Sequence, residues 1–270
     1  MKLKQKLLST AFAVASLIGA NSASAVIIGG VDFGPFNFHI ETTTLAESLI
    51  TGNGQTLTGY GQVNTVNGDP GYTGGPDLLY FILTYTSQDF TGTTLGFSGG
   101  VVDVYKGDLG NLLLTSSATN LANIAGLSQW VRLTGHGNLG GANPTSELDA
   151  IGTLTGASLS FTGTGLLDVD TSGAFGLAAV RAALNGNGLL DAIGGITDIA
   201  FTTSGNNSVL NTNDNTAGCK TGGAVAGQFC FAGSADLRGP MAVPEPGSLA
   251  LLGLGLLGFV GVGASKRRKS

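Results

Sequence analysis

The chain has 270 residues and a formal net charge of −5, and glycine supplies 46 residues, more than twice its usual share of about 7%. Glycine between short runs of Thr, Val, Leu and Phe favours a turn-rich, mostly β protein over a helical one. Residues 26–240 carry five basic and sixteen acidic side chains, a balance of −11. Such an acidic surface repels phosphate backbones, so we expect no nucleic acid partner.

Residues 1–25 predict a signal peptide. Three lysines within residues 1–6 precede an apolar run, and the small residues Ala23 and Ala25 follow it. A basic region, a hydrophobic region and a small-residue cleavage site in this order are typical of a secretory signal. We expect signal peptidase to cut after Ala25 and to leave Val26 as the first residue of the exported protein.

Residues 26–240 predict one extracellular β-rich domain, which is long enough to bury a core. The clearest buried strand is expected at residues 78–86, and a strand with small residues on one face at residues 57–66. Further short strands are expected around Phe97 and at residues 101–105, 112–115, 130–134, 151–154, 158–161 and 199–203. Short strands with turns between them indicate a turn-rich sandwich or barrel-like domain.

One segment departs from the strand pattern. Residues 174–184 are rich in alanine, with apolar side chains near helical spacing. Ser172 is a candidate N-cap, and Gly186 or Gly188 a stop signal. We therefore expect one short helix that packs on or between the strands.

Cys219 and Cys230 are the only cysteines, and the segment between them is rich in glycine. In an exported protein, an even pair of this kind predicts a disulfide. Closing a loop of about 12 residues stabilises the folded state by roughly 3 kcal/mol in the chain-entropy estimate.

Residues 168–173 begin like a calcium-binding loop. Asp168 and Asp170 stand at its first and third positions and Gly173 at its sixth, but Ala179 occupies the twelfth, where a bidentate acid is needed. The sequence therefore predicts a polar turn before the helix, with weak Ca²⁺ binding at Asp168 and Asp170 as the alternative.

No other motif predicts a metal or catalytic site. His39 and His136 are the only histidines, and neither has neighbours at metal-ligand spacing. The residues around Ser98 fit the G-x-S-x-G string of hydrolases, but a strand-like segment follows, where a nucleophile elbow needs a helix. We therefore expect no catalytic residue, no resident metal and no enzymatic activity.

Residues 241–270 contain three elements in a fixed order. A Pro-Glu-Pro motif comes first, an uncharged apolar run over residues 248–264 follows, and a basic tail comes last. Seventeen residues of helix measure about 25 Å, and basic side chains can snorkel to span a hydrocarbon core of roughly 30 Å. The positive-inside rule keeps the tail in the cytoplasm. The motif residues are Pro244, Glu245 and Pro246, and the tail residues are Lys266, Arg267, Arg268 and Lys269.

These three elements resemble the PEP-CTERM sorting signal, whose Pro-Glu-Pro motif an exosortase recognises and cleaves. The resemblance covers residues 243–270. It implies a transient stay in the inner membrane of a Gram-negative bacterium that makes exopolysaccharide, followed by transfer to the cell surface or extracellular matrix. The alternative, a plain membrane anchor, accounts for the helix and tail but not for the prolines.

The favoured function is a structural or adhesive component of the cell surface, biofilm or floc matrix, with exopolysaccharide or self-association as the interaction. A secreted carbohydrate-binding module is the second hypothesis, and a secreted hydrolase the third. Exposure of Trp130 and neighbouring tyrosines on one face would favour sugar binding, whereas a deep pocket with converging Asp, Ser and His side chains would favour a hydrolase.

Overall fold

The computed structural model describes residues 26–34, 37–74, 77–140 and 143–241, which belong to one compact unit. The predicted signal peptide, with Ala23 and Ala25, lies outside the described residues. So do the Pro-Glu-Pro motif, the apolar run and the basic tail. Among the described residues, no helix combines the length and the hydropathy that crossing a membrane requires.

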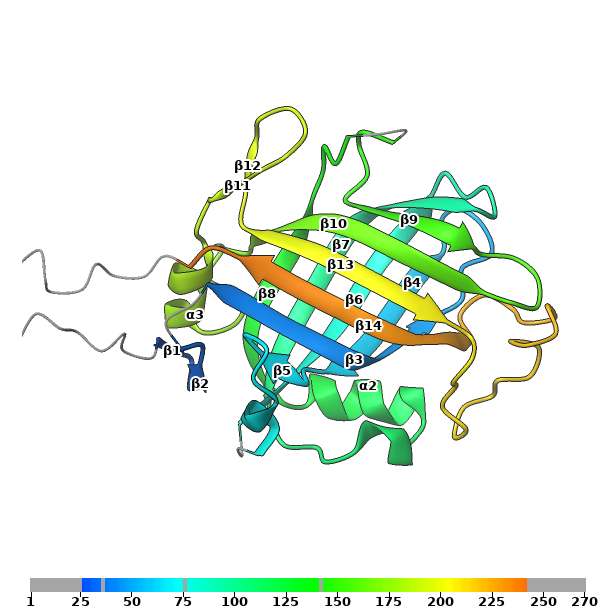
Figure 1. Ribbon diagram of the computed structural model, residues 1–270, viewed down its shortest axis with the longest axis horizontal. Helices are drawn as coiled ribbons and strands as arrows, with labels where there is room; N and C mark the ends of the chain where they lie inside the picture. Colours follow the sequence, from blue (N-terminus) through cyan, green and yellow to red (C-terminus); the bar gives the residue numbers. More distant parts are fainter. Residues whose placement is uncertain (1–25, 35–36, 75–76, 141–142, 242–270) are drawn as a thin grey trace, which may run out of the picture. The chain divides into compact units, whose positions relative to one another are not determined.

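The described residues form an antiparallel sheet that closes on itself (Figure 1), which confirms the mostly β prediction and decides for a barrel over a sandwich. Each of its eight main strands pairs with the next one along the chain, and the last pairs with the first. The strands are β3 (Phe38–Ser48), β4 (Thr56–Gln62), β6 (Leu78–Gln88), β7 (Thr94–Gly107), β8 (Ser128–His136), β10 (Ser160–Val169), β13 (Ile199–Asn206) and β14 (Phe229–Gly239).

Two positions of the barrel are each filled by an interrupted strand. Strand β9 (Leu148–Thr153) continues the line of β8, because both pair with β7 and with β10 at successive stretches. Strand β5 (Thr65–Val66) continues β4 along β3 in the same way. The segment between β8 and β9 therefore leaves the wall and returns to it. Two small hairpins, β1 (Ile27–Ile28) with β2 (Val31–Asp32) and β11 (Leu189–Leu190) with β12 (Ile196–Thr197), lie outside the main sheet.

The described residues contain two α-helices, one of which was not predicted. Helix α3 (Ala178–Leu184) confirms the expected helix, but it begins later, with Leu177 and not Ser172 at its N-cap. Helix α2 (Ser117–Ala125) has Ser116 as its N-cap. Residues 112–115, predicted as a strand, instead contain the 3₁₀ helix η2 (Leu112–Leu114); a second one, η1, spans Pro70–Gly74.

Local hydrogen bonds explain why the segment before α2 is not a strand. The side chain of Asn111 accepts a hydrogen bond from the Leu113 N–H (2.9 Å), and Ser116 accepts one from the Thr119 N–H (3.4 Å). Side chains that bond to the nearby backbone compete with strand pairing. Helix α2 then packs on the outer face of the wall, over a cluster that includes Tyr60, Tyr80 and Ile124.

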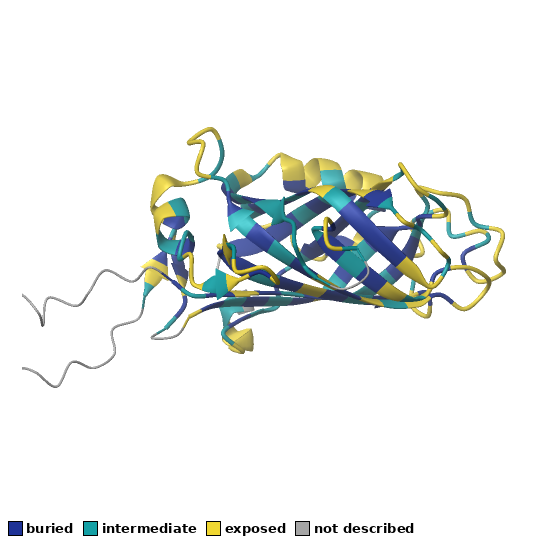
Figure 2. Ribbon diagram, turned by 90° about the horizontal axis from the view of Figure 1, so that it is seen from above, coloured by how far each residue is buried: buried dark blue, intermediate teal, exposed yellow. Residues whose placement is uncertain are grey.

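The core lies inside the barrel and at the barrel end near α3. Residues alternate between buried and more exposed along the strands (Figure 2), as expected for a sheet with one face packed. Trp130 is fully buried and stacks on Phe33, with 6.1 Å between ring centroids. Gly29 has a positive φ of 56°, and a Cβ atom there would overlap Trp130 and Val180. This close approach requires glycine.

Candidate functional sites on the barrel wall

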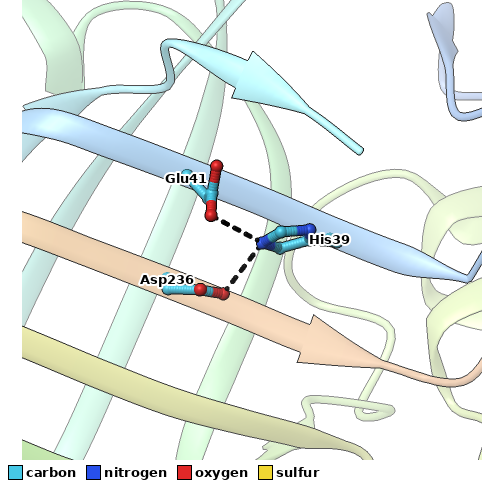
Figure 3. A group of neighbouring side chains, drawn as sticks. All are labelled: His39, Glu41 and Asp236. Carbon is cyan, nitrogen blue, oxygen red and sulfur yellow. Dashed lines mark ion pairs between the residues drawn. The ribbon is translucent and has the colours of Figure 1, made fainter. Parts of the chain in front are cut away.

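Three potential metal ligands meet on the outer wall, where β3 lies beside β14. Phe38 and Ile40 of β3 are buried, so His39 and Glu41 between them face outward. Glu41 stands opposite Asp236 of β14 in the strand register. His39, Glu41 and Asp236, here called the β3–β14 cluster, point toward one another (Figure 3).

The Nε2 atom of His39 lies between two carboxylates. It is 3.1 Å from Glu41 Oε1 and 3.3 Å from Asp236 Oδ1. Neither contact has hydrogen-bond geometry, and Nε2, which is sealed from solvent, has no hydrogen-bond partner among the described residues. A buried polar nitrogen without a partner is unfavourable, so this atom is the unusual feature of the cluster.

Two neighbours hold the carboxylates of the cluster. Thr65 Oγ1 of β5 donates a hydrogen bond to Glu41 Oε2 (2.8 Å). Arg238 Nε donates to both oxygens of Asp236 (2.9 and 2.8 Å), and Arg238 Nη2 lies 3.6 Å from Glu41 Oε1. The hydrogen bonds with Asp236 raise the pKa of Arg238. The Arg238 side chain is 60% exposed, so solvent screens these ion pairs.

The second histidine also lies between two carboxylates, but both of its ring nitrogens have partners. His136 Nδ1 is 2.7 Å from Asp168 Oδ2 of β10, and Nε2 is 3.2 Å from Asp191 Oδ2. Burial lowers the pKa of His136, but the hydrogen bonds with Asp168 and Asp191 outweigh it, so the pKa is raised. Asp191 also accepts hydrogen bonds from the backbone of the β11–β12 hairpin. This arrangement attaches the hairpin to the wall.

The candidate calcium residues separate into two local roles. Asp168 bonds to His136, whereas Asp170 accepts a hydrogen bond from the Ser172 N–H (2.9 Å). The hydrogen bonds from Ser172 lower the pKa of Asp170. Among the described residues, the three potential metal ligands whose atoms lie within 4.8 Å of one another belong to the β3–β14 cluster and not to this loop. Weak Ca²⁺ binding at Asp168 and Asp170 stays a prediction.

A groove of about 660 Å³ lies on the outer wall between β3, β14, β13 and the segment that follows β13; we call it the outer groove. Asp214 in this segment accepts hydrogen bonds from the backbone N–H (2.7 Å) and the hydroxyl of Ser117 at the start of α2. The lining combines polar and apolar side chains. The hydroxyl and amide groups come from Thr43, Thr44, Ser204, Asn206, Asn211, Thr212 and Ser234, with Asp214 beside them, and the apolar part includes Leu112, Val209, Leu210, Phe229 and Phe231.

The Cys219–Cys230 disulfide, as predicted, closes the loop beside the outer groove. Both cysteines are fully buried, with a Cα–Cα distance of 5.3 Å. The side chain of Asn207 donates hydrogen bonds to the carbonyl oxygens of Cys219 (2.6 Å) and Ala157 (2.8 Å). The disulfide therefore connects the loop to β14, and Asn207 connects it to the segment before β10.

The positions of Trp130 and Ser98 bear on the sugar-binding and hydrolase hypotheses. Trp130 is fully buried, so it offers no exposed stacking platform to a sugar. Ser98 lies within β7, and the strand continues past it to Gly107. Because the nucleophile elbow requires a strand-to-helix turn, Ser98 is not in that geometry.

Glu47 is an acid buried in the barrel, and no motif in the sequence predicts its position. Its side chain lines a cavity of about 30 Å³ with apolar neighbours such as Leu57 and Phe97. Its Oε1 has no hydrogen-bond partner in the described structure. Burial raises the pKa of Glu47 to about 8, and a hydrogen bond with Thr203 offsets part of this increase. Glu47 is therefore largely protonated at neutral pH.

Comparison with known proteins addresses the C-terminal segment. Residues 242–268 match the family model of the PEP-CTERM protein-sorting motif. The chain therefore carries a PEP-CTERM protein-sorting motif, which supports processing by an exosortase. The motif directs this PEP-CTERM protein to export and to the cell surface. No curated protein and no solved structure matches the chain.

Proposed function

We propose that this PEP-CTERM protein is a structural or adhesive component of the biofilm or floc matrix and that it acts without catalysis. The sorting motif at residues 242–268 carries this proposal, because it sends the domain to the outside of the cell. The acidic balance of −11 over residues 26–240 adds support. A surface of this charge keeps the domain hydrated and suits it to a matrix of hydrated polymers.

The fold is compatible with this role. In the closed wall, each main strand has a paired neighbour on both sides. A closed sheet has no free edge, which protects it from uncontrolled strand addition. We therefore expect outward-facing side chains and loops, such as those that line the outer groove, to make the specific contacts with other molecules.

The processing route forms part of the proposal. Signal peptidase cuts after Ala25, and the apolar run holds the precursor in the inner membrane of a Gram-negative host. An exosortase then cuts at the Pro-Glu-Pro motif and transfers the domain to the surface or matrix.

Deletion of the gene tests the matrix role. We expect the deletion strain to form less biofilm or fewer flocs, and the unaltered gene to restore them. A matched control strain receives a gene that encodes the secreted domain without residues 241–270. Unchanged aggregation, biofilm mass and matrix composition after deletion would contradict the proposal.

A second candidate function, carbohydrate binding, is favoured by the outer groove. Hydroxyl and amide side chains with an aromatic ring are suited to hydrogen-bonding and stacking against a sugar chain. Ser234→Phe fills the groove and is expected to abolish binding of exopolysaccharide isolated from the host. Thr164→Phe, at an exposed position of β10 outside the groove, is the control. Equal exopolysaccharide binding by both variants would exclude the groove as the sugar site.

A further inference from the structure

We propose that the β3–β14 cluster binds a divalent transition-metal ion, and that Zn²⁺ is the ion that fits it. Zinc accepts imidazole nitrogen and carboxylate oxygen as ligands. His39 Nε2, Glu41 Oε1 and Asp236 Oδ1 offer one nitrogen and two oxygens. The proposal concerns the outer wall alone and does not depend on the matrix role.

The distances within the cluster support the proposal. Ligands bonded to zinc at about 2.0 Å in a tetrahedron lie about 3.3 Å from one another. The Nε2 atom of His39 lies 3.1 Å from Glu41 Oε1 and 3.3 Å from Asp236 Oδ1. The two carboxylate oxygens lie within 4.8 Å of each other. Both nitrogen–oxygen distances therefore match the spacing that a tetrahedral zinc site requires.

The bonding state of His39 is the second observation. Its Nε2 atom is sealed from solvent and lacks a hydrogen-bond partner in the described structure. The two carboxylate oxygens stand at either side of that atom (Figure 3). A cation between the three groups satisfies the nitrogen lone pair and both oxygens together.

The barrel holds the ligands in place. His39 and Glu41 are two residues apart on the outward face of β3, and Asp236 comes from the paired strand β14. Thr65 orients Glu41 through a hydrogen bond to the oxygen that the metal does not use. Second-layer contacts of this kind position metal ligands. Three protein ligands leave a coordination position open for water or for a carboxylate of another molecule.

The same geometry disfavours calcium. Calcium takes six to eight oxygen ligands, whereas the cluster offers two carboxylates and an imidazole nitrogen. Imidazole suits zinc, copper, iron and nickel. We therefore expect Zn²⁺ to bind at concentrations at which Ca²⁺ does not.

Arg238 is the competitor of the metal, because its guanidinium already pairs with Asp236 and approaches Glu41. Its side chain is 60% exposed and can turn into solvent. If the cluster is a metal site, removal of this positive charge tightens metal binding. If the cluster is an ion-pair network alone, the same removal creates no metal affinity.

Calorimetric titration of the chelator-treated exported protein with ZnCl₂ tests the proposal, with CaCl₂ as the comparison cation. We expect one Zn²⁺ per chain. His39→Gln and Asp236→Asn should each weaken binding by about tenfold or more, whereas Arg238→Gln should strengthen it. His136→Gln is the matched control, since His136 also lies between two carboxylates; it should leave Zn²⁺ affinity unchanged.

Co²⁺ provides a second measurement, because intense visible absorption distinguishes four-coordinate Co²⁺ bound to the protein from the weakly absorbing hydrated ion. We expect this absorption to appear in the unaltered protein and in Arg238→Gln, and to be lost in Glu41→Gln. Glu41→Gln is the substitute ligand variant if His39→Gln fails to fold. Absence of saturable Zn²⁺ binding would overturn the proposal. Zn²⁺ binding that persists at equal strength in both His39→Gln and Glu41→Gln would also overturn it.

Discussion

Replacing Glu47 by glutamine keeps the shape of the side chain and removes its acidic proton. In the folded protein, burial raises the pKa of Glu47 from 4.5 to about 8. The unfolded chain exposes the side chain and restores the ordinary value. Between these two pH values the unfolded state binds fewer protons than the folded state, so the free energy of unfolding falls as pH rises.

The size of the effect follows from the same two values. The pKa increase corresponds to about 5 kcal/mol, at about 1.4 kcal/mol for each pKa unit. Native domains have total stabilities of about 5–15 kcal/mol, so a contribution of this size is a large fraction of the total. At pH 4.5, we expect Glu47→Gln and the unaltered protein to unfold at similar denaturant concentrations. At pH 8, we expect Glu47→Gln to unfold at a clearly higher concentration than the unaltered protein.

Urea unfolding of the exported protein at pH 4.5, 6, 7 and 8 measures this dependence. Trp130 fluorescence reports it, because this fully buried residue is the single tryptophan of the chain. Glu41→Gln, on the outward face of the same strand, is the control: it retains Glu47 and should retain the slope. His136, whose pKa is also raised, contributes in the same direction above pH 6.5 but is present in both variants. An equal slope in Glu47→Gln and the unaltered protein would refute the reasoning.

Three further predictions concern the disulfide and the two ends of the chain. Replacing Cys219 and Cys230 together by serine should lower the free energy of unfolding by roughly 3 kcal/mol, measured by urea unfolding; stability equal to that of the oxidised protein would contradict a stabilising disulfide. N-terminal sequencing of the exported protein should begin at Val26, and a start far from this residue would exclude cleavage after Ala25. Replacing Pro244, Glu245 and Pro246 by alanine should leave the anchor intact and block processing, so that fractionation and immunoblotting find a larger, membrane-bound species; normal release would mean that another protease removes an ordinary anchor.

Features set by neighbouring residues were predictable from the sequence. The order of motif, apolar run and basic tail indicated the sorting signal, because each part acts through its local composition. The apolar run at residues 78–86 became β6, since a continuous run of this length suits a buried strand. The cysteine pair formed its disulfide across a short loop. The helix at Ala178–Leu184 was predictable in kind but began later than its candidate cap, because Ser172 lies in the Asp170 turn.

Other features depend on strands that meet only in the folded barrel. Strand β3 was not predicted, and so neither the burial of Glu47 nor the outward direction of His39 and Glu41 could be inferred. Asp236 joins them only because β14 closes the barrel against β3, and nothing in the local sequence encodes a partner nearly two hundred residues away. Trp130 is buried because it packs on Phe33 and against Gly29, and burial inside the closed barrel raises the pKa of Glu47. Local sequence thus determined several of the strands, the sorting signal and the cysteine pair, whereas long-range pairing decided which polar side chains meet and which lose contact with water.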